Sequence, residues 1–209
     1  MNIVIGNQKG GVGKSTLCIL FANYLSLIHA SSCMILDMDF QSSIASLWEK
    51  DRSNFSNPPL YEVLELELES FSKIRDKLIE ANGHFIIDLP GKMDDNELVP
   101  IYKSASLVLC PFTYDKITFE STLVFAQVIR HLNKNVPMAF LPNRVKAGVR
   151  YELKSKVHAV LSRFGTVCPE FSDRVAFQRI DTLTIPEDID DLVKSVFGSI
   201  YNQFFIKTE

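Results

Sequence analysis

A glycine-rich stretch near the amino terminus has the residue types that bind phosphate. It reads Lys9-Gly10-Gly11-Val12-Gly13-Lys14-Ser15-Thr16. Small residues let successive backbone N–H groups close around phosphate oxygens. Lys14 adds a positive charge suited to β- and γ-phosphates, and the Ser15 hydroxyl can bind Mg²⁺. A flexible glycine turn is the alternative, but it leaves the Lys-Ser pair unexplained. We therefore expect Gly10 to Thr16 to hold a nucleotide with its magnesium ion.

Three carboxylates follow apolar runs and could support that chemistry. Asp37 and Asp39 come directly after one such run, and Asp88 ends another. Open α/β sheets bind ligands at the carboxyl ends of their strands. Asp88 is placed to hold a magnesium-bound water. The alternatives are that one of the first two carboxylates only caps the next helix and that Asp88 only belongs to a turn before a Pro-Gly pair.

Short apolar runs alternate with helix-like stretches, and this pattern must position those residues. Continuous apolar strands between helices are typical of a parallel sheet covered on both faces. The predicted fold is therefore α/β and doubly wound, with a mostly parallel sheet and helices on both faces. The predicted strands are residues 3–5, 33–36, 84–87, 107–110 and 138–141, and the first predicted helix is residues 14–28.

The rest of the chain is interpreted as helical in two places. Between residues 41 and 81 the pattern is helical and more polar, and Pro58-Pro59 could open a short helix at Leu60. Its glutamates at 62, 65, 67 and 69 are interpreted as a solvated face. Residues 189–205 have apolar side chains at helical spacing, which predicts a last helix packed on the sheet. No repeat or linker interrupts the chain, so we expect a single domain over residues 1–209.

Composition excludes several classes. The 209 residues carry a net charge of −3, so only a local basic surface would favour nucleic acid. The early apolar run is too short and polar to span a bilayer, and a strand at the amino terminus leaves no room for a signal peptide. We expect a cytoplasmic protein. The four cysteines are far apart without a CxxC pair, which predicts buried reduced thiols: Cys18, Cys33, Cys110 and Cys168.

The segment from Asn7 to Thr16 resembles the deviant Walker A motif of the ParA/MinD family. Gln8 stands where the usual phosphate loop has glycine, and Lys9 is an additional lysine. The resemblance implies an ATPase whose extra lysine reaches the partner's phosphates across a nucleotide-sandwich homodimer. That role falls to Lys9, so Lys9, Lys14 and Asp39 are the predicted catalytic residues.

The carboxylate motifs extend the resemblance. Leu36-Asp37-Met38-Asp39-Phe40-Gln41-Ser42 is similar to the family's Asp-x-Asp-Pro-Gln motif, with Phe40 in place of proline. By this resemblance Asp39 positions the attacking water and contacts the magnesium shell, whereas Asp37 orients the loop. Residues 85–91 fit a Walker B strand that delivers Asp88. The implied cofactors are ATP and Mg²⁺, with Ser15, Asp39 and Asp88 on the metal side.

Later segments resemble the family more loosely. Residues 106–112 are similar to the strand before a partner-facing helix, and residues 171–177 are similar to the closing segment. Phe140-Leu141-Pro142-Asn143-Arg144-Val145 resembles a strand that ends in Asn-Arg. An asparagine side chain both donates and accepts hydrogen bonds, which suits an adenine edge. Asn143 is therefore predicted to contact the base.

Residues 144–163 contain six basic residues and one acidic residue. Lys146, Arg150 and Lys154 are spaced by four, and the apolar residues between them fit the inner face of a helix. This predicts a basic helix. A solvated face is one interpretation of it. The other, drawn from the family, is sequence-independent contact with DNA phosphates after ATP-driven dimerisation.

The resemblance implies a ParA-like ATPase with weak, partner-stimulated turnover, which partitions or positions plasmid or chromosomal DNA or another cargo. A ParB-like or other adaptor protein is the expected partner, and the protein would be nucleoid-associated if the basic segment binds DNA. Because the phosphate loop begins almost at once, an amino-terminal domain that reads an operator is not expected. The alternative is a MinD-like regulator at the membrane, which would use a basic amphipathic helix as its anchor, whereas the tail has only Lys194 and Lys207. A metal-cluster relative would need a bridging cysteine pair.

Overall fold

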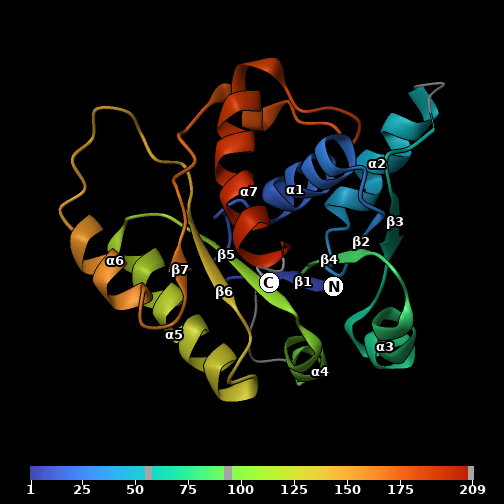
Figure 1. Cartoon of the computed structure of the whole chain (residues 1–209), viewed down its shortest axis with the longest axis horizontal. Coiled ribbons are helices and arrows are strands. Elements are labelled where there is room, and N and C mark those ends of the chain that lie inside the picture. The colour runs from blue at the N-terminus through green and yellow to red at the C-terminus, as the bar shows by residue number, and fades with distance from the viewer. Residues whose placement is uncertain (55–57, 92–95, 207–209) are drawn as a thin grey trace.

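Seven strands form one parallel sheet in the order β3-β2-β4-β1-β5-β6-β7 (Figure 1). The computed structural model describes residues 1–54, 58–91 and 96–206. The strands are β1 (Asn2–Ile5), β2 (Cys33–Asp37), β3 (Glu62–Glu65), β4 (His84–Asp88), β5 (Leu107–Phe112), β6 (Met138–Pro142) and β7 (Thr166–Val167). Every pairing between neighbouring strands is parallel, which confirms the predicted sheet.

Helices cover both faces of the sheet, and each face has its own apolar core. Helices α1, α2 and α7 pack on one face, and α3, α4, α5 and α6 pack on the other (Figure 1). The α-helices are α1 (Lys14–His29), α2 (Ser43–Asn54), α3 (Phe71–Glu80), α4 (Leu98–Ser104), α5 (Lys116–Leu132), α6 (Lys154–Leu161) and α7 (Asp190–Phe204). Three short 3₁₀ turns are also described: η1 (Leu68–Ser70), η2 (Val175–Gln178) and η3 (Glu187–Ile189).

The central strand β1 explains why the strands are apolar throughout. Ile3 and Ile5 belong to the core beneath α1, whereas Val4 belongs to the opposite core. Successive side chains of a strand point to opposite faces, so a strand covered on both sides has no polar face. Because β1 lies between β4 and β5, the chain order reverses at β1, where such sheets bind ligands.

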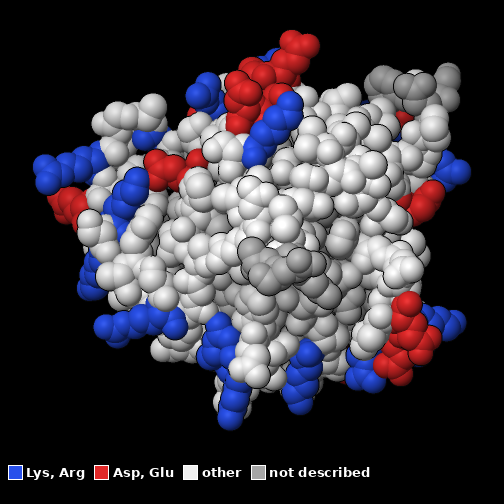
Figure 2. Space-filling model, viewed as in Figure 1, with Lys and Arg blue, Asp and Glu red and all other residues white. Residues whose placement is uncertain are grey.

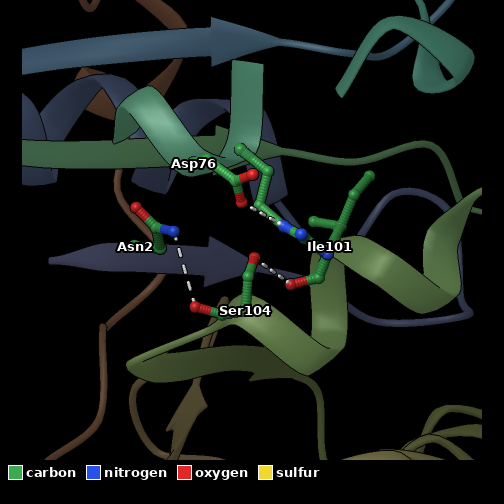
Figure 3. Close-up of polar contacts among 5 residues, drawn as sticks. Asn2, Asp76, Ile101 and Ser104 are labelled. Carbon is green, nitrogen blue, oxygen red and sulfur yellow. Dashed lines mark hydrogen bonds and ion pairs between the residues drawn. The ribbon is translucent and has the colours of Figure 1, made fainter. Parts of the chain in front are cut away.

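The start of β1 is also tied to a helix end. The Asn2 side chain donates to the carbonyl of Ser104 at 3.4 Å, and the Ser104 hydroxyl donates to the carbonyl of Ile101 at 2.9 Å (Figure 3). These bonds pair carbonyls at the carboxyl end of α4, where a helix leaves them free. The nearby ion pair of Arg75 and Asp76 is exposed and contributes little.

The last helix is confirmed. In α7, Val193, Val196, Phe197 and Ile200 are buried, and the Phe197 ring lies 4.8 Å from that of Phe21 on α1. Lys207, one of the two tail lysines considered for the MinD-like alternative, lies outside the described residues. Among the described residues, no helix has the length and apolar character needed to cross a membrane.

The short helix predicted at Leu60 is wrong. The segment after Pro58-Pro59 forms strand β3, which pairs in parallel with β2. Most residues of this edge strand are exposed, so it did not show the continuous apolar pattern of the central strands. The glutamates at 62, 65, 67 and 69 are exposed, as the solvated-face interpretation expected. Helical structure follows later, in η1 and α3.

The continuous basic helix is also wrong. Helix α6 begins only at Lys154, and Lys146 and Arg150 lie in an exposed loop before it. Gly148 has φ of 73°, a left-handed conformation that interrupts a helix. Val145 forms a parallel β-bridge with Ser172, so the segment begins with a paired residue and not with a helix. Spacing by four therefore did not reflect one helix face.

All four cysteines are free; Cys33 is half-buried and the other three are buried. Burial raises the pKa of Cys33 to about 11 and that of Cys168 to about 12, so these thiols stay protonated near neutral pH. Within the described parts of the chain, no group of three or more His, Cys, Asp or Glu side chains is arranged to hold a metal ion. The predicted burial therefore holds for Cys18, Cys110 and Cys168 and only in part for Cys33.

Candidate nucleotide-binding site

The phosphate loop connects the end of β1 to the start of α1, and Asn7 fixes its entrance. The buried Asn7 side chain donates to the carbonyl of Pro111 at 2.8 Å and to the hydroxyl of Thr122 at 2.9 Å. Its Oδ1 accepts a bond from the N–H of Lys9 at 3.0 Å. One side chain therefore ties the loop to β5 and α5. The sequence motif included Asn7, but nothing in the sequence indicated this role.

Two glycines make the turn into α1. Gly11 has φ of 78° and Gly13 has φ of 92°, conformations that favour glycine. A Cβ on Gly13 would lie 2.4 Å from the Asn143 side-chain nitrogen, so a larger residue has no room there. Helix α1 then begins at Lys14, and the N–H groups of its first turn have no intrahelical acceptor. Free N–H groups at a helix start suit an anion.

Ser15 and Asp88 meet at the carboxyl end of β4. The Ser15 hydroxyl donates to Asp88 Oδ2 at 2.5 Å. The other oxygen, Oδ1, is buried and has no hydrogen-bond partner among the described residues. Burial raises the pKa of Asp88 to about 7, against the lowering effect of the Ser15 bond. A buried carboxylate with one unpaired oxygen beside a hydroxyl is suited to a metal-bound water.

Asp37 and Asp39 have different surroundings. Asp37 is buried, and its Oδ2 accepts from the N–H groups of Ile44 and Ala45 at 3.0 Å each. It therefore caps the start of α2. Burial raises the pKa of Asp37, and its backbone bonds act in the opposite direction. Asp39 is half-buried, accepts from the N–H of Gln41 at 3.1 Å and lines a cavity with the phosphate loop.

Asn143, the residue after β6, lies directly behind the loop. Its amide nitrogen donates to the carbonyl of Val12 at 2.8 Å, and its Oδ1 accepts from the N–H of Arg144 at 2.9 Å. The side chain is only 4% exposed. Asn143 therefore supports the loop itself, a role that the sequence did not indicate. One N–H of its amide and one lone pair of its oxygen remain for another partner.

Two adjoining cavities follow this arrangement. One of about 530 Å³ lies over the phosphate loop and includes Lys14, Ser15 and Asp39 in its lining. The other, of about 620 Å³, includes Asn143 together with the segment that carries Arg174 and Phe177. Both are lined by Gly13, Thr16 and Arg144. The first suits phosphates and a cation, and the second has the size and position for a base and sugar.

The two lysines of the loop have opposite environments. Lys14 is 8% exposed and lines the first cavity, so its charge is directed to whatever occupies it. Lys9 is exposed, and its side chain forms no hydrogen bond or ion pair with other described residues. The structure thus separates a lysine inside the site from a lysine on its surface.

Most predicted site residues come together, whereas Arg150 and Lys154 do not. Gly10, Gly11, Gly13, Lys14, Ser15, Thr16 and Asp39 line the first cavity. Lys146 lines the second cavity, whereas Arg150 and Lys154 lie beyond it. Lys154 pairs with Glu170 at 2.6 Å, so its charge is partly satisfied within the chain. Arg144, which lines both cavities, was not predicted as a site residue from the sequence.

A family model described as the CobQ/CobB/MinD/ParA nucleotide binding domain matches residues 3–179. No curated protein matches the chain.

Several solved structures are similar in fold. A Borrelia burgdorferi protein described as a plasmid partition protein, bound to AMPPNP, is 19% identical, with 97% of this chain and 98% of that chain covered and a TM-score of 0.78. The MinD cell division protein of Aquifex aeolicus is 13% identical, with 100% and 98% covered and a TM-score of 0.69. The ParA protein of pNOB8, bound to nonspecific DNA, is 15% identical, with 98% and 91% covered and a TM-score of 0.61.

These identities establish the fold alone, whereas the family model spans the chain from β1 to the end of η2. The residues it covers include Lys14, Ser15 and Asp88, which lie together at the carboxyl edge of the sheet. The chain therefore belongs to the CobQ/CobB/MinD/ParA family of nucleotide-binding domains.

Proposed function

We propose that this chain is a ParA-type ATPase. ATP joins two copies into a sandwich dimer, the dimer binds DNA without regard to sequence, and a ParB-like or other adaptor stimulates weak hydrolysis and release. The work is partitioning or positioning of plasmid or chromosomal DNA or another cargo. The main support is the pair of lysines in the phosphate loop. Lys14 lines the first cavity, over the phosphate loop, and Lys9 is exposed.

ATP and Mg²⁺ fit the residues present. The glycine turn and the start of α1 supply N–H groups for phosphate oxygens, and Lys14 supplies charge. Ser15, Asp39 and Asp88 offer oxygen atoms, which magnesium prefers. The magnesium ion would neutralise charge on the phosphates. Asp39 would orient the attacking water, and Asn143 retains hydrogen-bonding capacity for the base.

The first test is nucleotide binding. Replacing Lys14 with alanine removes the buried charge, so we expect Lys14→Ala to weaken ATP binding by at least roughly 100-fold in a calorimetric titration. Lys73→Ala changes an exposed lysine of α3 and serves as the matched control. Unchanged ATP affinity in Lys14→Ala would refute the assignment of the phosphate site.

The second test separates Lys9 from Asp39. Because the Lys9 side chain has no described partner within the chain, Lys9→Ala is expected to bind ATP as a monomer and to fail to dimerise. Asp39→Ala is expected to accumulate an ATP-bound dimer, because the water is no longer oriented. Light scattering with ATP and Mg²⁺ measures both, again with Lys73→Ala as control. A Lys9→Ala protein that dimerises as the parent does would rule out a role across the interface.

The DNA contact is assigned to the loop before α6. Lys146 and Arg150 are exposed there. Lys146 also lines the second cavity, the one suited to a base and sugar, so the loop would lie close to bound nucleotide. Figure 2 shows basic side chains along the margin formed by α5 and α6. The ParA protein of pNOB8, which has a similar fold, has been solved bound to nonspecific DNA. Two such loops in one dimer would double the phosphate contacts, so binding should require ATP.

A gel-shift series in ATP, ADP and rising salt tests this contact. Each phosphate contact adds about −0.9 to the slope of log affinity against log salt. The double variant Lys146→Glu/Arg150→Glu should lose DNA binding and keep ATP-driven dimerisation. Lys73→Glu/Lys77→Glu on α3 changes the charge equally at the far end of the sheet and should bind as the parent does (Figure 1). If both double variants shift DNA equally well, the DNA contact does not lie in this loop.

A further inference from the structure

The turn between β2 and α2 carries Asp39, and its shape depends on Ser42. The N–H of Ser42 donates to the carbonyl of Asp39 at 2.9 Å, and the N–H of Gln41 donates to Asp39 Oδ1 at 3.1 Å. Ser42 has φ of 46°, a left-handed conformation that is unfavourable for a residue with a Cβ. Such a turn needs an outside contact to keep Asp39 at the edge of the phosphate cavity.

Glu65, at the end of β3, supplies that contact. The Ser42 hydroxyl donates to Glu65 Oε1 at 2.5 Å. The backbone of Glu65 is itself fixed, because it pairs with Asp37 in the sheet and the next residue, Leu66, donates to the carbonyl of Asp37 at 3.0 Å. The carboxylate therefore holds the turn from a fixed position on the edge strand, 23 residues away from Ser42 in the chain.

The two ends of the segment from β2 to α2 thus have separate supports. Asp37 accepts from the N–H groups of Ile44 and Ala45 and holds the start of α2. Glu65 holds the turn itself, through Ser42. Neither Glu65 nor Ser42 lines the phosphate cavity, so neither can act on bound nucleotide directly. Any effect of Glu65 on the reaction must pass through the position of Asp39.

We propose that Glu65 is a positioning residue, which keeps Asp39 oriented through its hydrogen bond with Ser42. The inference rests on the proposed function, in which Asp39 orients the attacking water. The bond matters for turnover and not for nucleotide affinity, because the phosphates are held by the loop and Lys14. The edge strand β3 thereby becomes part of the hydrolytic machinery, although it lies outside the family's carboxylate motif in the sequence.

The test is steady-state ATP hydrolysis by four variants and the parent. Glu65→Ala should lower kcat about fivefold with KM for ATP within twofold of the parent, a loss within the reach of one exposed hydrogen bond. Glu65→Gln keeps an acceptor oxygen and should restore most of kcat. Ser42→Ala should match Glu65→Ala, and the double variant Ser42→Ala/Glu65→Ala should be no slower than either.

Glu62→Ala is the matched control, because Glu62 is an exposed glutamate of the same strand and forms no hydrogen bond or ion pair with other described residues. It should hydrolyse ATP as the parent does. Equal kcat values for Glu65→Ala and Glu62→Ala would overturn the inference and leave the proposed function intact. The inference would also be overturned if Glu65→Ala lowered kcat together with a matching rise in KM and a lower melting temperature. A parent that binds ATP and does not hydrolyse it would overturn the proposed function and this inference together.

Discussion

Replacing Asp88 with asparagine should change how the stability of the nucleotide-free protein depends on pH. The carboxyl is buried, and its pKa is raised from 3.8 to about 7. A raised carboxyl pKa means that the folded protein keeps a proton that the unfolded chain has lost. Burial of Asp88 therefore has no pH-dependent cost below about pH 4, where the carboxyl is protonated in both states. As the pH rises toward 7, it lowers the free energy of unfolding progressively.

The magnitude follows from the size of that shift. One pKa unit corresponds to about 1.4 kcal/mol, so Asp88 should cost the parent up to about 4 kcal/mol between pH 4 and pH 7. The amide introduced by Asp88→Asn would not titrate, and its oxygen could still accept the Ser15 bond. The free energy of unfolding of Asp88→Asn, relative to the parent, should therefore rise over this interval by a similar amount and level off above it.

Urea unfolding at half-unit steps from pH 4 to pH 8, without nucleotide or magnesium, measures this difference. Any cost of burying the new amide is the same at every pH, and titrating groups that do not interact with Asp88 are common to both proteins, so both cancel from the slope. A difference between Asp88→Asn and parent that stays flat across this range would refute the argument that burial controls Asp88.

Two further substitutions test the support of the phosphate loop. Gly13→Ala forces a Cβ to 2.4 Å from the Asn143 nitrogen at φ of 92° and should lower the free energy of unfolding by about 2 kcal/mol or more, whereas Gly10→Ala, with no neighbour within 4 Å, should not. Urea unfolding compares the two, and equal losses would contradict the packing. Asn143→Ala leaves the carbonyl of Val12 without its donor and should lose about 1–3 kcal/mol in the same assay. Asn143→Asp should not restore it, because a carboxylate cannot donate, and full recovery by that variant would exclude the bond as the cause.

The sequence predicted the parts that depend on local pattern. The phosphate loop and Asp88 were found because glycine, lysine and an apolar run before a carboxylate are adjacent in the chain. Five strands were found because β1, β2, β4, β5 and β6 lie inside the sheet and are apolar. Burial on both faces imposes that composition, so it is visible without knowledge of the neighbours.

The edge strands needed the tertiary structure. β3 has exposed glutamates and gains its conformation from pairing with β2, and β7 has only two residues. The basic segment had the spacing of a helix, but Gly148 and the bridge of Val145 with Ser172 prevent one. Local propensity is weak and is overridden when long-range pairing stabilises another conformation.

The supports of the site were also decided only by the fold. Asn7 reaches Pro111 across 104 residues, Asn143 reaches Val12 across 131, and Ser42 reaches Glu65 across 23. A polar residue in the sequence carries no mark of the partner it will meet. The sequence by itself therefore indicated the groups that we propose bind phosphate and magnesium. The tertiary structure decided which side chains hold those groups in place, because hydrogen bonds between distant residues form only after the sheet has set their distance and orientation.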